Sequence, residues 1–242
     1  MGVFDLPAPL FAVLDHGFGV VASPVVRLII WGLIGAVISM GAYWLLSPQR
    51  RIAEAKARAL EARRELDAYD GELSGAWPLM RRMLRAALRQ LGLVTAPAVL
   101  ASLPVIAMLV WLDTAYGYAL PAAEAPVAMH TVPNGFEARL APSHNPAAER
   151  QIVVTDQEGR VVERVPMAAP VSTIHKWQWW NFLIGNPAGY LPDQAVLDQI
   201  AIDLPERQYL SFGPTWLRAW YVVFFASLLV GSLAIKFAAR IE

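Results

Sequence analysis

Three long apolar runs divide the chain. The first covers nineteen residues from Leu28 to Leu46, the second covers twenty from Leu93 to Leu112, and the third covers seventeen from Ala219 to Ile235. A helix rises about 1.5 Å per residue, so runs of this length approach the roughly 30 Å of a bilayer's hydrocarbon core. Prolines within the second run, Pro97 and Pro104, are expected to kink a membrane helix without ending it. The pattern predicts three transmembrane helices.

The stretch before the first run is apolar but interrupted. Residues 8–22 contain Pro9, Asp15, Gly17 and Gly19, and no basic residue precedes them, so they resemble neither a span nor a secretory signal. We expect this segment to lie at the membrane interface; a disordered tail is the alternative.

Residues 48–92 carry a helical pattern between the first two runs. Seven positions fall at alternating spacings of three and four, which indicates a heptad seam: Ile52, Ala55, Ala59, Ala62, Leu66, Tyr69 and Leu73. Asp70-Gly71 and Gly75 then predict a turn, and Pro78 suits the first turn of a second helix. We expect two antiparallel helices joined over residues 70–77; a single bent, solvated helix is the alternative.

The stretch between the second and third runs predicts strands. Alternating or β-branched residues occur at Val127–Val132, Phe136–Leu140, Gln151–Thr155 and Arg160–Val165, with a hairpin turn at residues 156–159. Residues Pro192–Leu204 have the spacing of a short amphipathic helix. This region is therefore expected to be a small mixed α/β domain.

These elements give a fold class and a division of the chain. We predict an α-helical integral membrane protein with three transmembrane helices, a cytosolic antiparallel helical hairpin and a small extracytosolic mixed α/β domain. The predicted segments are the interfacial residues 1–23, the first span 24–47, the hairpin 48–92, the second span 93–115, the extracytosolic domain 116–213, and the third span with a short tail 214–242.

Composition supports a membrane protein and excludes several kinds of chemistry. Of the 242 residues, 56% are hydrophobic and 17% are charged, against about 25% charged in an average soluble domain. The formal net charge is zero, so no bulk attraction to nucleic acid is expected. The absence of cysteine excludes disulfides and thiolate chemistry. Arginine outnumbers lysine by 17 to 3, which is typical of a GC-rich bacterial genome.

Charge is distributed unevenly, and this predicts an orientation. Residues 48–92 contain ten basic and six acidic side chains, whereas residues 113–217 contain six basic and eleven acidic ones. Lys236 and Arg240 follow the third run. Cytoplasmic loops are enriched in Lys and Arg. We therefore expect a bacterial inner-membrane protein with its N-terminus outside and its C-terminus inside.

No motif for catalysis or for a cofactor is recognisable. The four histidines, His16, His130, His144 and His175, are not spaced as metal ligands, and nucleotide-binding glycine loops and nucleophile elbows are absent. We predict a protein that is not an enzyme and that has no cofactor and no metal.

Arginines near the predicted membrane boundary are the first candidate site residues. Arg27 precedes the first run, where it either reaches back to the interface or faces a polar groove. Arg218 has the same two interpretations before the third run. On the second hairpin helix, Arg81, Arg82, Arg85 and Arg89 would contact anionic lipid headgroups or line a basic groove for part of another protein.

Other candidates are polar, flexible or aromatic residues. Ser39 and Ser102 would line a polar face of the spans or help helices to pack. Met80 and Met83 suit a surface that meets varied apolar partners. Five tryptophans are expected at the membrane interface, and the first three also suit docking of a partner: Trp177, Trp179, Trp180, Trp216 and Trp220.

One region of the chain resembles part of the Oxa1 superfamily. It consists of the stretch AYWLLSPQRRIAEAKARALEARREL and the later stretch LMRRMLRAALRQLGLVTAPAVLASLPVIAMLVWL. This superfamily includes YidC-like insertases, their archaeal relatives, subunit 3 of the endoplasmic reticulum membrane complex and TMCO1-like proteins. The resemblance implies a first span with its N-terminus outside, a cytosolic coiled-coil hairpin, and two further spans around a polar, basic groove. It places Arg27 nearest to the family's charged groove residue. About 100 residues between the second and third spans depart from the small members.

The resemblance implies insertion or assembly of membrane proteins through a hydrated basic groove. The predicted partners are membrane lipids and hydrophobic membrane-protein clients or partner subunits, and not nucleic acid. A structural or accessory subunit of a larger membrane complex is the alternative function, and a membrane sensor with an extracytosolic ligand-binding domain is a further one.

Overall fold

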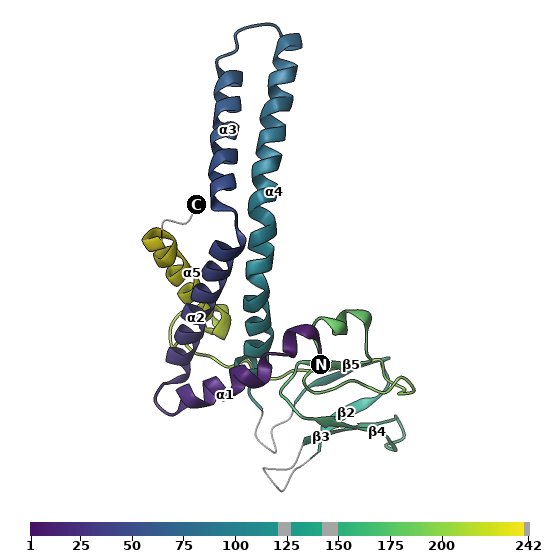
Figure 1. Ribbon diagram of the computed structural model, residues 1–242. Coiled ribbons are helices and arrows are strands. Elements are labelled where there is room, and N and C mark those ends of the chain that lie inside the picture. The colour runs from purple at the N-terminus through teal and green to yellow at the C-terminus, as the bar shows by residue number, and fades with distance from the viewer. Residues whose placement is uncertain (121–126, 142–149, 240–242) are drawn as a thin grey trace. The chain divides into compact units, whose positions relative to one another are not determined.

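The computed structural model describes residues 1–120, 127–141 and 150–239, apart from the side chains of Leu73 and Ser74. His144 and Arg240, named above, lie outside these residues. The chain forms two compact units (Figure 1). Unit 1 consists of Met1–Leu28 and Ile106–Val223, and unit 2 consists of Ile29–Val105 and the chain from Phe224 onward.

Three helices are long and apolar enough to cross a membrane, as the three runs predict. They are α2 (Pro24–Leu46), the C-terminal part of α4 (Leu73–Leu112) and α5 (Trp220–Ala239). Helix α2 begins at Pro24 because the fixed φ of proline suits the first helical position. Arg27 therefore lies in the first turn of the helix and not before it.

Helix α3 (Gln49–Asp67) and the N-terminal part of α4 form the predicted antiparallel hairpin (Figure 1). Ile52, Ala55 and Ala62 are buried, which confirms the first part of the heptad seam. The seam is shorter than predicted, because α3 ends at Asp67. Helix α4 begins at Leu73, five residues before Pro78.

The second helix of the hairpin and the predicted second span form a single helix, α4. The sequence predicts a boundary between them near residue 92, whereas α4 continues for 40 residues and includes Pro78, Pro97 and Pro104. At about 1.5 Å per residue, α4 is roughly 60 Å long. The polar residues of its first half and the apolar residues of its second half therefore share one backbone rod. Five further residues, Asp113–Gly117, extend it as a wider turn.

Small residues bring α2 and α5 together within unit 2. A Cβ atom added at Gly32 would lie 2.6 Å from the Cβ atom of Ser227, and one added at Gly231 would lie 2.9 Å from the Cβ atom of Ala36. Each helix thus presents two small residues four positions apart, the pattern that allows membrane helices to approach closely. Gly32 and Ala36 therefore form a packing face of α2.

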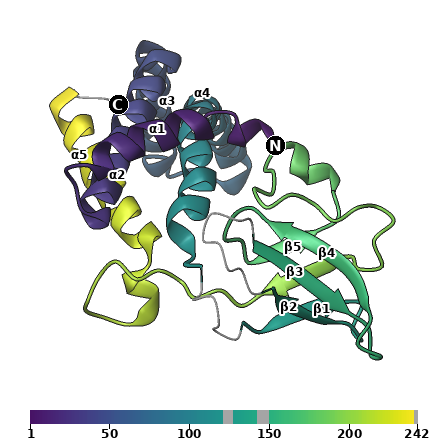
Figure 2. The same ribbon diagram turned by 90° about the horizontal axis from the view of Figure 1, so that it is seen from below.

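The β domain in unit 1 consists of two antiparallel three-stranded sheets (Figure 2). In order of pairing, one sheet contains β1 (Met129–Val132), β6 (Gln199–Ile202) and β5 (Thr173–His175), and the other contains β2 (Glu137–Leu140), β3 (Arg150–Thr155) and β4 (Val161–Met167). Residues of both sheets share one core, which includes Ile152, Val154, Ile174 and Ile200. The four predicted strands are confirmed with shifts of one or two residues at most ends.

The predicted helix at Pro192–Leu204 is wrong. This segment contains strand β6, which pairs with β1 on one side and β5 on the other. Ile200, Ile202 and Leu204 alternate into the core, so a period of two overrides the helical spacing of Leu197 and Ile200. Within the described residues 127–214, helical structure is limited to a short 3-10 turn at Trp179–Phe182. The domain is therefore a β domain and not a mixed α/β domain.

The N-terminal segment is helical and belongs to unit 1. A 3-10 turn at Val3–Asp5 leads into α1 (Ala8–Gly19), and four residues separate α1 from α2. This arrangement excludes the alternative of a disordered tail. No residue of α1 is fully buried.

Candidate functional site

A groove on the hairpin is lined by three of the four predicted arginines, Arg82, Arg85 and Arg89, whereas Arg81 is exposed and does not line it. It has a volume of about 220 Å³, and its floor consists of the small residues of the seam. The small floor leaves room for the charged walls to converge. Four arginines and one acid surround it, from both helices of the hairpin: Arg58, Glu61, Arg82, Arg85 and Arg89.

Arg85 and Arg89 leave the groove with a net positive charge, because they outnumber its one acid, Glu61. Arg82 forms an ion pair with Glu65 at 2.7 Å, and Arg58 is 3.3 Å from Glu54. Arg85 and Arg89 have no ion-pair partner among the residues that the structure describes. The groove can therefore attract an anionic group.

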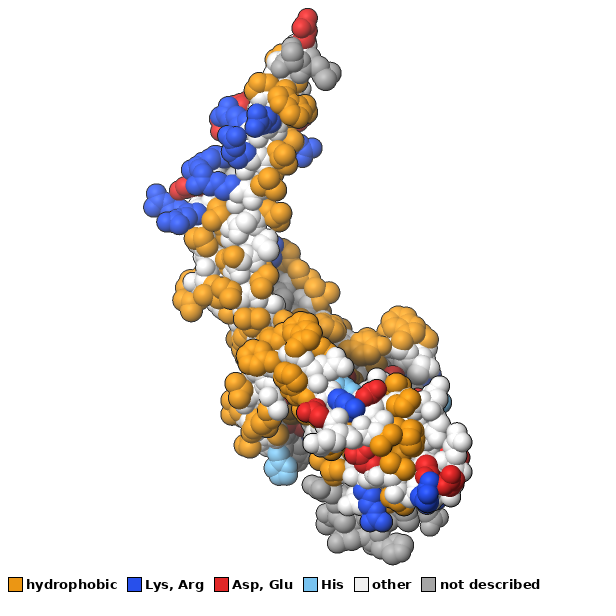
Figure 3. Space-filling view, turned by 90° about the vertical axis from the view of Figure 1, so that its right-hand side faces the viewer, with side chains coloured by type: hydrophobic (Ala, Val, Ile, Leu, Met, Phe, Trp, Pro, Cys, Tyr) orange, Lys and Arg blue, Asp and Glu red, His pale blue; other side chains and the backbone are white. Residues whose placement is uncertain are grey.

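An apolar stripe runs along the same helix as these arginines. Its large side chains are mostly more than half exposed, at positions that follow one face of α4: Trp77, Leu84, Leu88 and Leu91. Figure 3 shows hydrophobic and basic side chains close together on the hairpin surface. Met80 and Met83 are half-buried beside this stripe. Apolar and cationic groups are thus available together on α4.

The hydroxyl groups of Ser39 and Ser102 form hydrogen bonds within their own helices. The Ser39 hydroxyl donates to the carbonyl of Ala36 at 3.3 Å, and the Ser102 hydroxyl donates to the carbonyl of Val99 at 2.7 Å. These bonds satisfy each hydroxyl locally, as is common for serine in membrane helices. The described structure does not bring Ser39 and Ser102 together.

Arg27 lies in a second cluster, which we call the clasp: Phe11, Asp15, Arg27, Trp111, Tyr116 and Tyr209. The Nη1 atom of Arg27 is 2.8 Å from an Asp15 carboxylate oxygen, and the side chains are only 22% and 13% exposed. Tyr116 donates its hydroxyl hydrogen to the same carboxylate. The Arg27 guanidinium also lies over the Tyr116 ring, 5.5 Å from its centre. Arg27 therefore belongs to unit 1, whereas Arg85 and Arg89 belong to unit 2.

Aromatic contacts extend the clasp across unit 1. Phe11 of α1 contacts Trp111 with ring centres 5.7 Å apart, Trp111 contacts Tyr116, and Tyr116 contacts Tyr209. The Tyr209 hydroxyl donates to the Tyr116 carbonyl at 2.8 Å. Burial raises the pKa of Tyr209, so this hydroxyl remains a donor. The clasp joins α1, the first turn of α2, the end of α4 and the chain before α5.

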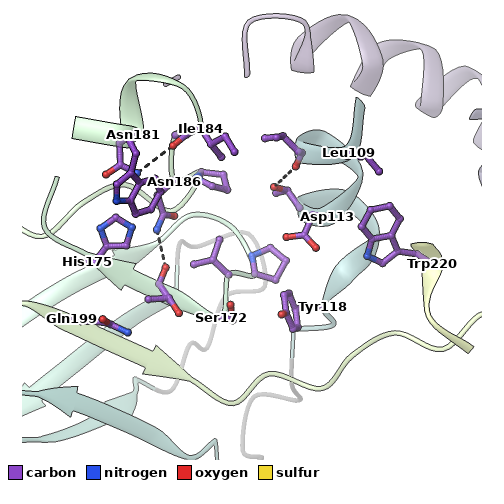
Figure 4. A pocket seen from close by; sticks show the side chains of 18 residues that line it. Leu109, Asp113, Tyr118, Ser172, His175, Asn181, Ile184, Asn186, Gln199 and Trp220 are labelled. Atoms are coloured by element: carbon purple, nitrogen blue, oxygen red, sulfur yellow. Dashed lines mark hydrogen bonds between the residues drawn. The ribbon is translucent and has the colours of Figure 1, made fainter. Parts of the chain in front are cut away.

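A larger cavity of about 700 Å³ lies in unit 1 beside the clasp's α4 end (Figure 4). Its lining includes Leu109, Tyr118, His175 and Trp220. The His175 ring packs 5.0 Å from Trp180, and its Nδ1 atom is 2.6 Å from the carbonyl oxygen of Lys176. That geometry leaves Nε2 as the nitrogen available to a ligand.

Asparagines of the cavity wall mainly support loops. Asn181 donates to the carbonyl of Ile184 at 3.2 Å, and Asn186 donates to the carbonyl of Thr173 at 2.7 Å. Among the described lining residues, no hydrogen bond joins a nucleophile to a base. The cavity is thus a mostly apolar recess without an assembled catalytic group.

The predicted interface residues near α5 have different environments. Trp216 is exposed, whereas Trp220 is buried. Arg218 donates from Nε to the carbonyl of Gly213 at 2.8 Å and from Nη1 to the Gln208 side chain at 3.2 Å. Trp177, Trp179 and Trp180 are all exposed on the loop that follows β5.

Comparison with known proteins adds no family. No family model, curated protein or solved structure matches the chain. Within the described residues, no three His, Asp or Glu side chains are grouped to hold a metal ion.

Sequence reasoning missed five members of the clasp: Phe11, Asp15, Trp111, Tyr116 and Tyr209. In the sequence, Asp15 appears only as an interruption of an apolar segment. An acid within one apolar segment and an arginine at the start of the next are opposite charges in an environment that disfavours either alone. That combination was the available signal for the pair.

Proposed function

We propose that this chain assists the insertion or assembly of membrane proteins, with the hairpin in the cytosol and the β domain on the other side of a bacterial inner membrane. The observation that carries the proposal is the groove of Arg85 and Arg89 beside the apolar stripe of α4. The resemblance to the Oxa1 superfamily and the excess of basic residues in 48–92 support the same assignment.

The proposed client is a hydrophobic segment with an acidic or polar flank. Leu84, Leu88 and Leu91 would contact the apolar part of this segment, while Arg85 and Arg89 would contact the flank. A charged group at the centre of a bilayer costs about 2.5–3.5 kcal/mol or more. Arginines that remain paired with the flank as it leaves water would act as counter-charges and offset part of this cost. The step requires neither nucleotide nor metal.

Insertion into liposomes tests this function. The purified protein is reconstituted, and protease protection measures insertion of a single-span client with an acidic N-terminal tail. Because two charges are reversed, Arg85→Glu/Arg89→Glu is expected to reduce the rate at least roughly tenfold. The matched control is Arg51→Glu/Arg64→Glu, which changes two exposed arginines of α3 outside the groove. Equal rates for the two double variants would contradict the proposal.

An accessory subunit is the second candidate, because the exposed stripe also suits permanent contact with another membrane protein. The same liposomes distinguish the two functions. An accessory subunit would give no insertion above that of protein-free liposomes. In native membranes, such a subunit would be crosslinked to its partner, and Leu84→Glu/Leu88→Glu would abolish that crosslink. Insertion by the purified chain alone would contradict the accessory function.

A further inference from the structure

The ends of all three candidate spans belong to the same compact unit as the β domain. Unit 1 includes Pro24–Leu28 of α2, Ile106–Leu112 of α4 and Trp220–Val223 of α5. It also contains α1, which is only four residues from α2. If the three helices cross a bilayer, one surface of that bilayer therefore lies at unit 1.

Helix α1 exposes apolar side chains and turns its acidic side chain inward, which is the reverse of a helix on the surface of a soluble protein. Its more buried side carries Phe11, Asp15 and Phe18, so its only acid points inward. Its exposed side carries Leu10, at 60% exposure, and Val13, at 71%. A soluble helix instead exposes its charges and buries its leucines. The apolar side of α1 is thus suited to a non-aqueous environment.

Both acids of the first 23 residues are satisfied within unit 1. Asp5 accepts hydrogen bonds from the backbone amides of Gly2 at 2.6 Å and Gly185 at 2.9 Å. Asp15 is held by Arg27 and Tyr116. Neither carboxylate therefore needs water, and His16 is the one exposed ionisable side chain of α1.

The N-terminus is also bonded to the aromatic loop of the β domain. The Phe4 amide donates to the Leu183 carbonyl at 3.0 Å, in addition to the bond between Gly185 and Asp5. Figure 2 shows the N-terminus beside this loop. The loop exposes large apolar side chains on its surface: Trp177, Trp179, Trp180, Phe182, Leu183 and Ile184.

We infer that α1 and the loop Trp177–Ile184 form one bilayer-contacting face, which holds the β domain against the membrane surface. The occupant of this face is the headgroup and upper acyl region of the lipid. Tryptophan prefers that depth, and helices with an exposed apolar side lie in the interface plane. The continuity with three span ends favours lipid over a protein partner.

The face has almost no charge, which makes the inference specific. Lys176, at its edge, is paired with Asp198 at 2.8 Å. Basic interfacial helices bind anionic lipid through charge. This face is instead expected to bind zwitterionic and anionic membranes equally, because it would bind through apolar burial alone.

Single cysteines carrying nitroxide labels test the inference, since the native chain has none. The test positions are Val13, Trp179 and Phe182, in vesicles of pure phosphatidylcholine and of phosphatidylcholine with phosphatidylglycerol. The control positions are Val37 of α2, which reports that the protein is inserted, and Glu158 of the β3–β4 turn, which reports water. Power saturation with oxygen and with a water-soluble nickel complex gives the depth of each label.

Labels at the three test positions are expected to be more accessible to oxygen than to nickel, in both lipids. The inference would be overturned if the Trp179 and Phe182 labels were as accessible to nickel as the Glu158 label while the Val37 label was in lipid. Protection of these labels in native membranes but not in pure vesicles would assign the face to a partner protein and would also overturn it. The result is independent of insertion activity, since it requires only that the protein is inserted.

Asp5→Ala provides a second test. Loss of the two bonds that Asp5 accepts is expected to make the Trp179 label more water-accessible while the Val37 and Glu158 labels stay unchanged. No change at Trp179 would show that the N-terminus and the loop do not form one face.

Discussion

In the hairpin part of α4 the arginines are exposed, and three of them, Arg81, Arg85 and Arg89, have no ion-pair partner among the described residues. Near the Leu112 end of α4, Arg27 of α2 is instead enclosed with a carboxylate and two tyrosines. The Arg82–Glu65 pair is 62% and 35% exposed, and the Arg27–Asp15 pair is 22% and 13% exposed, although their contact distances are nearly equal. A pair of an arginine and a carboxylate thus has two different roles in this chain. The enclosed pair, Arg27–Asp15, stabilises the fold, whereas the arginines near the exposed pair, Arg82–Glu65, remain accessible to a binding partner.

The largest effect is expected from Arg27→Gln, because Asp15 would keep an enclosed carboxylate without a cation. Removing one partner of a buried pair costs about 3–5 kcal/mol, and the residual exposure of this pair favours a loss near about 3 kcal/mol. Thermal unfolding in detergent micelles measures the change. The double variant Arg27→Gln/Asp15→Asn should recover part of the loss. Wild-type stability of the single variant would show that enclosure does not distinguish the two pairs.

A packing change without charge is expected to have the next largest effect. In Gly32→Leu the new side chain would meet the Ser227 Cβ atom and the Phe224 carbonyl oxygen, at 2.6 and 2.7 Å from the added Cβ atom. Overpacking of this kind costs about 1–3 kcal/mol. Gly41→Leu is the matched control on the same helix, since nothing lies within 4 Å of its added Cβ atom. Equal unfolding temperatures for the two variants would argue against close packing of α2 and α5.

Tyr209→Phe tests the hydrogen bonds of the clasp. The loss of the 2.8 Å bond to the Tyr116 carbonyl is expected to cost about 1 kcal/mol at neutral pH. Burial raises the folded-state pKa of Tyr209. Stability from this group is therefore complete below the ordinary tyrosine pKa of about 10 and is lost as pH rises through the higher folded-state pKa. The free energy of unfolding, measured across this alkaline range, should decline less steeply in the variant than in the wild type. An identical decline would contradict burial of Tyr209.

Arg82→Gln is expected to cost only about 0.5 kcal/mol, because exposed ion pairs contribute about 0.2–1 kcal/mol. The measurement is the same thermal unfolding as for Arg27→Gln, in the same detergent. A loss as large as that of Arg27→Gln would remove the distinction between the two ends of α4.

The smallest effect is expected at the β3–β4 turn and is confined to acid. The backbone amide of Arg160, with further bonds from its side chain and from the Glu158 amide, lowers the pKa of Asp156. Its stabilisation is present above the ordinary pKa of about 3.9 and is lost as pH falls through the lower folded-state pKa. Hydrogen exchange of the turn amides, corrected for intrinsic rates, should increase below about pH 4. Asp156→Asn should remove this dependence, and an unchanged dependence would assign it to another group.

The three long apolar helices and the hairpin could be predicted because their signals are local. Uncharged runs identify α2 and α5, and the spacing of Ile52, Ala55 and Ala62 identifies the seam. The start of α2 at Pro24 agrees with the expected first span of residues 24–47, whereas α4 passes the boundary expected near residue 92. Strand β6 was missed because its two partners are distant in the sequence. Pairing across the chain decided its conformation.

The clasp could not be predicted because its contacts join distant residues. The Tyr116 hydroxyl contacts Asp15 across 101 residues, and the Tyr209 hydroxyl contacts the Tyr116 carbonyl across 93. Local propensity contains no information on which distant groups meet. Three arginines of the hairpin groove, Arg82, Arg85 and Arg89, could be predicted because they fall, with Arg81, within nine residues of one helix. Arg58, on the other helix, was not predicted.

The small-residue contact between α2 and α5 has a consequence for biosynthesis. Gly32 and Ala36 are synthesised well before Ser227 and Gly231, each of which lies 195 positions further along the chain than the residue it meets. Until α5 is made, the small face of α2 therefore lacks its partner. Synthesis of α5 closes that face, so a product truncated before α5 would display it. Quality-control proteases would thereby have a feature that separates chains without α5 from chains that contain it.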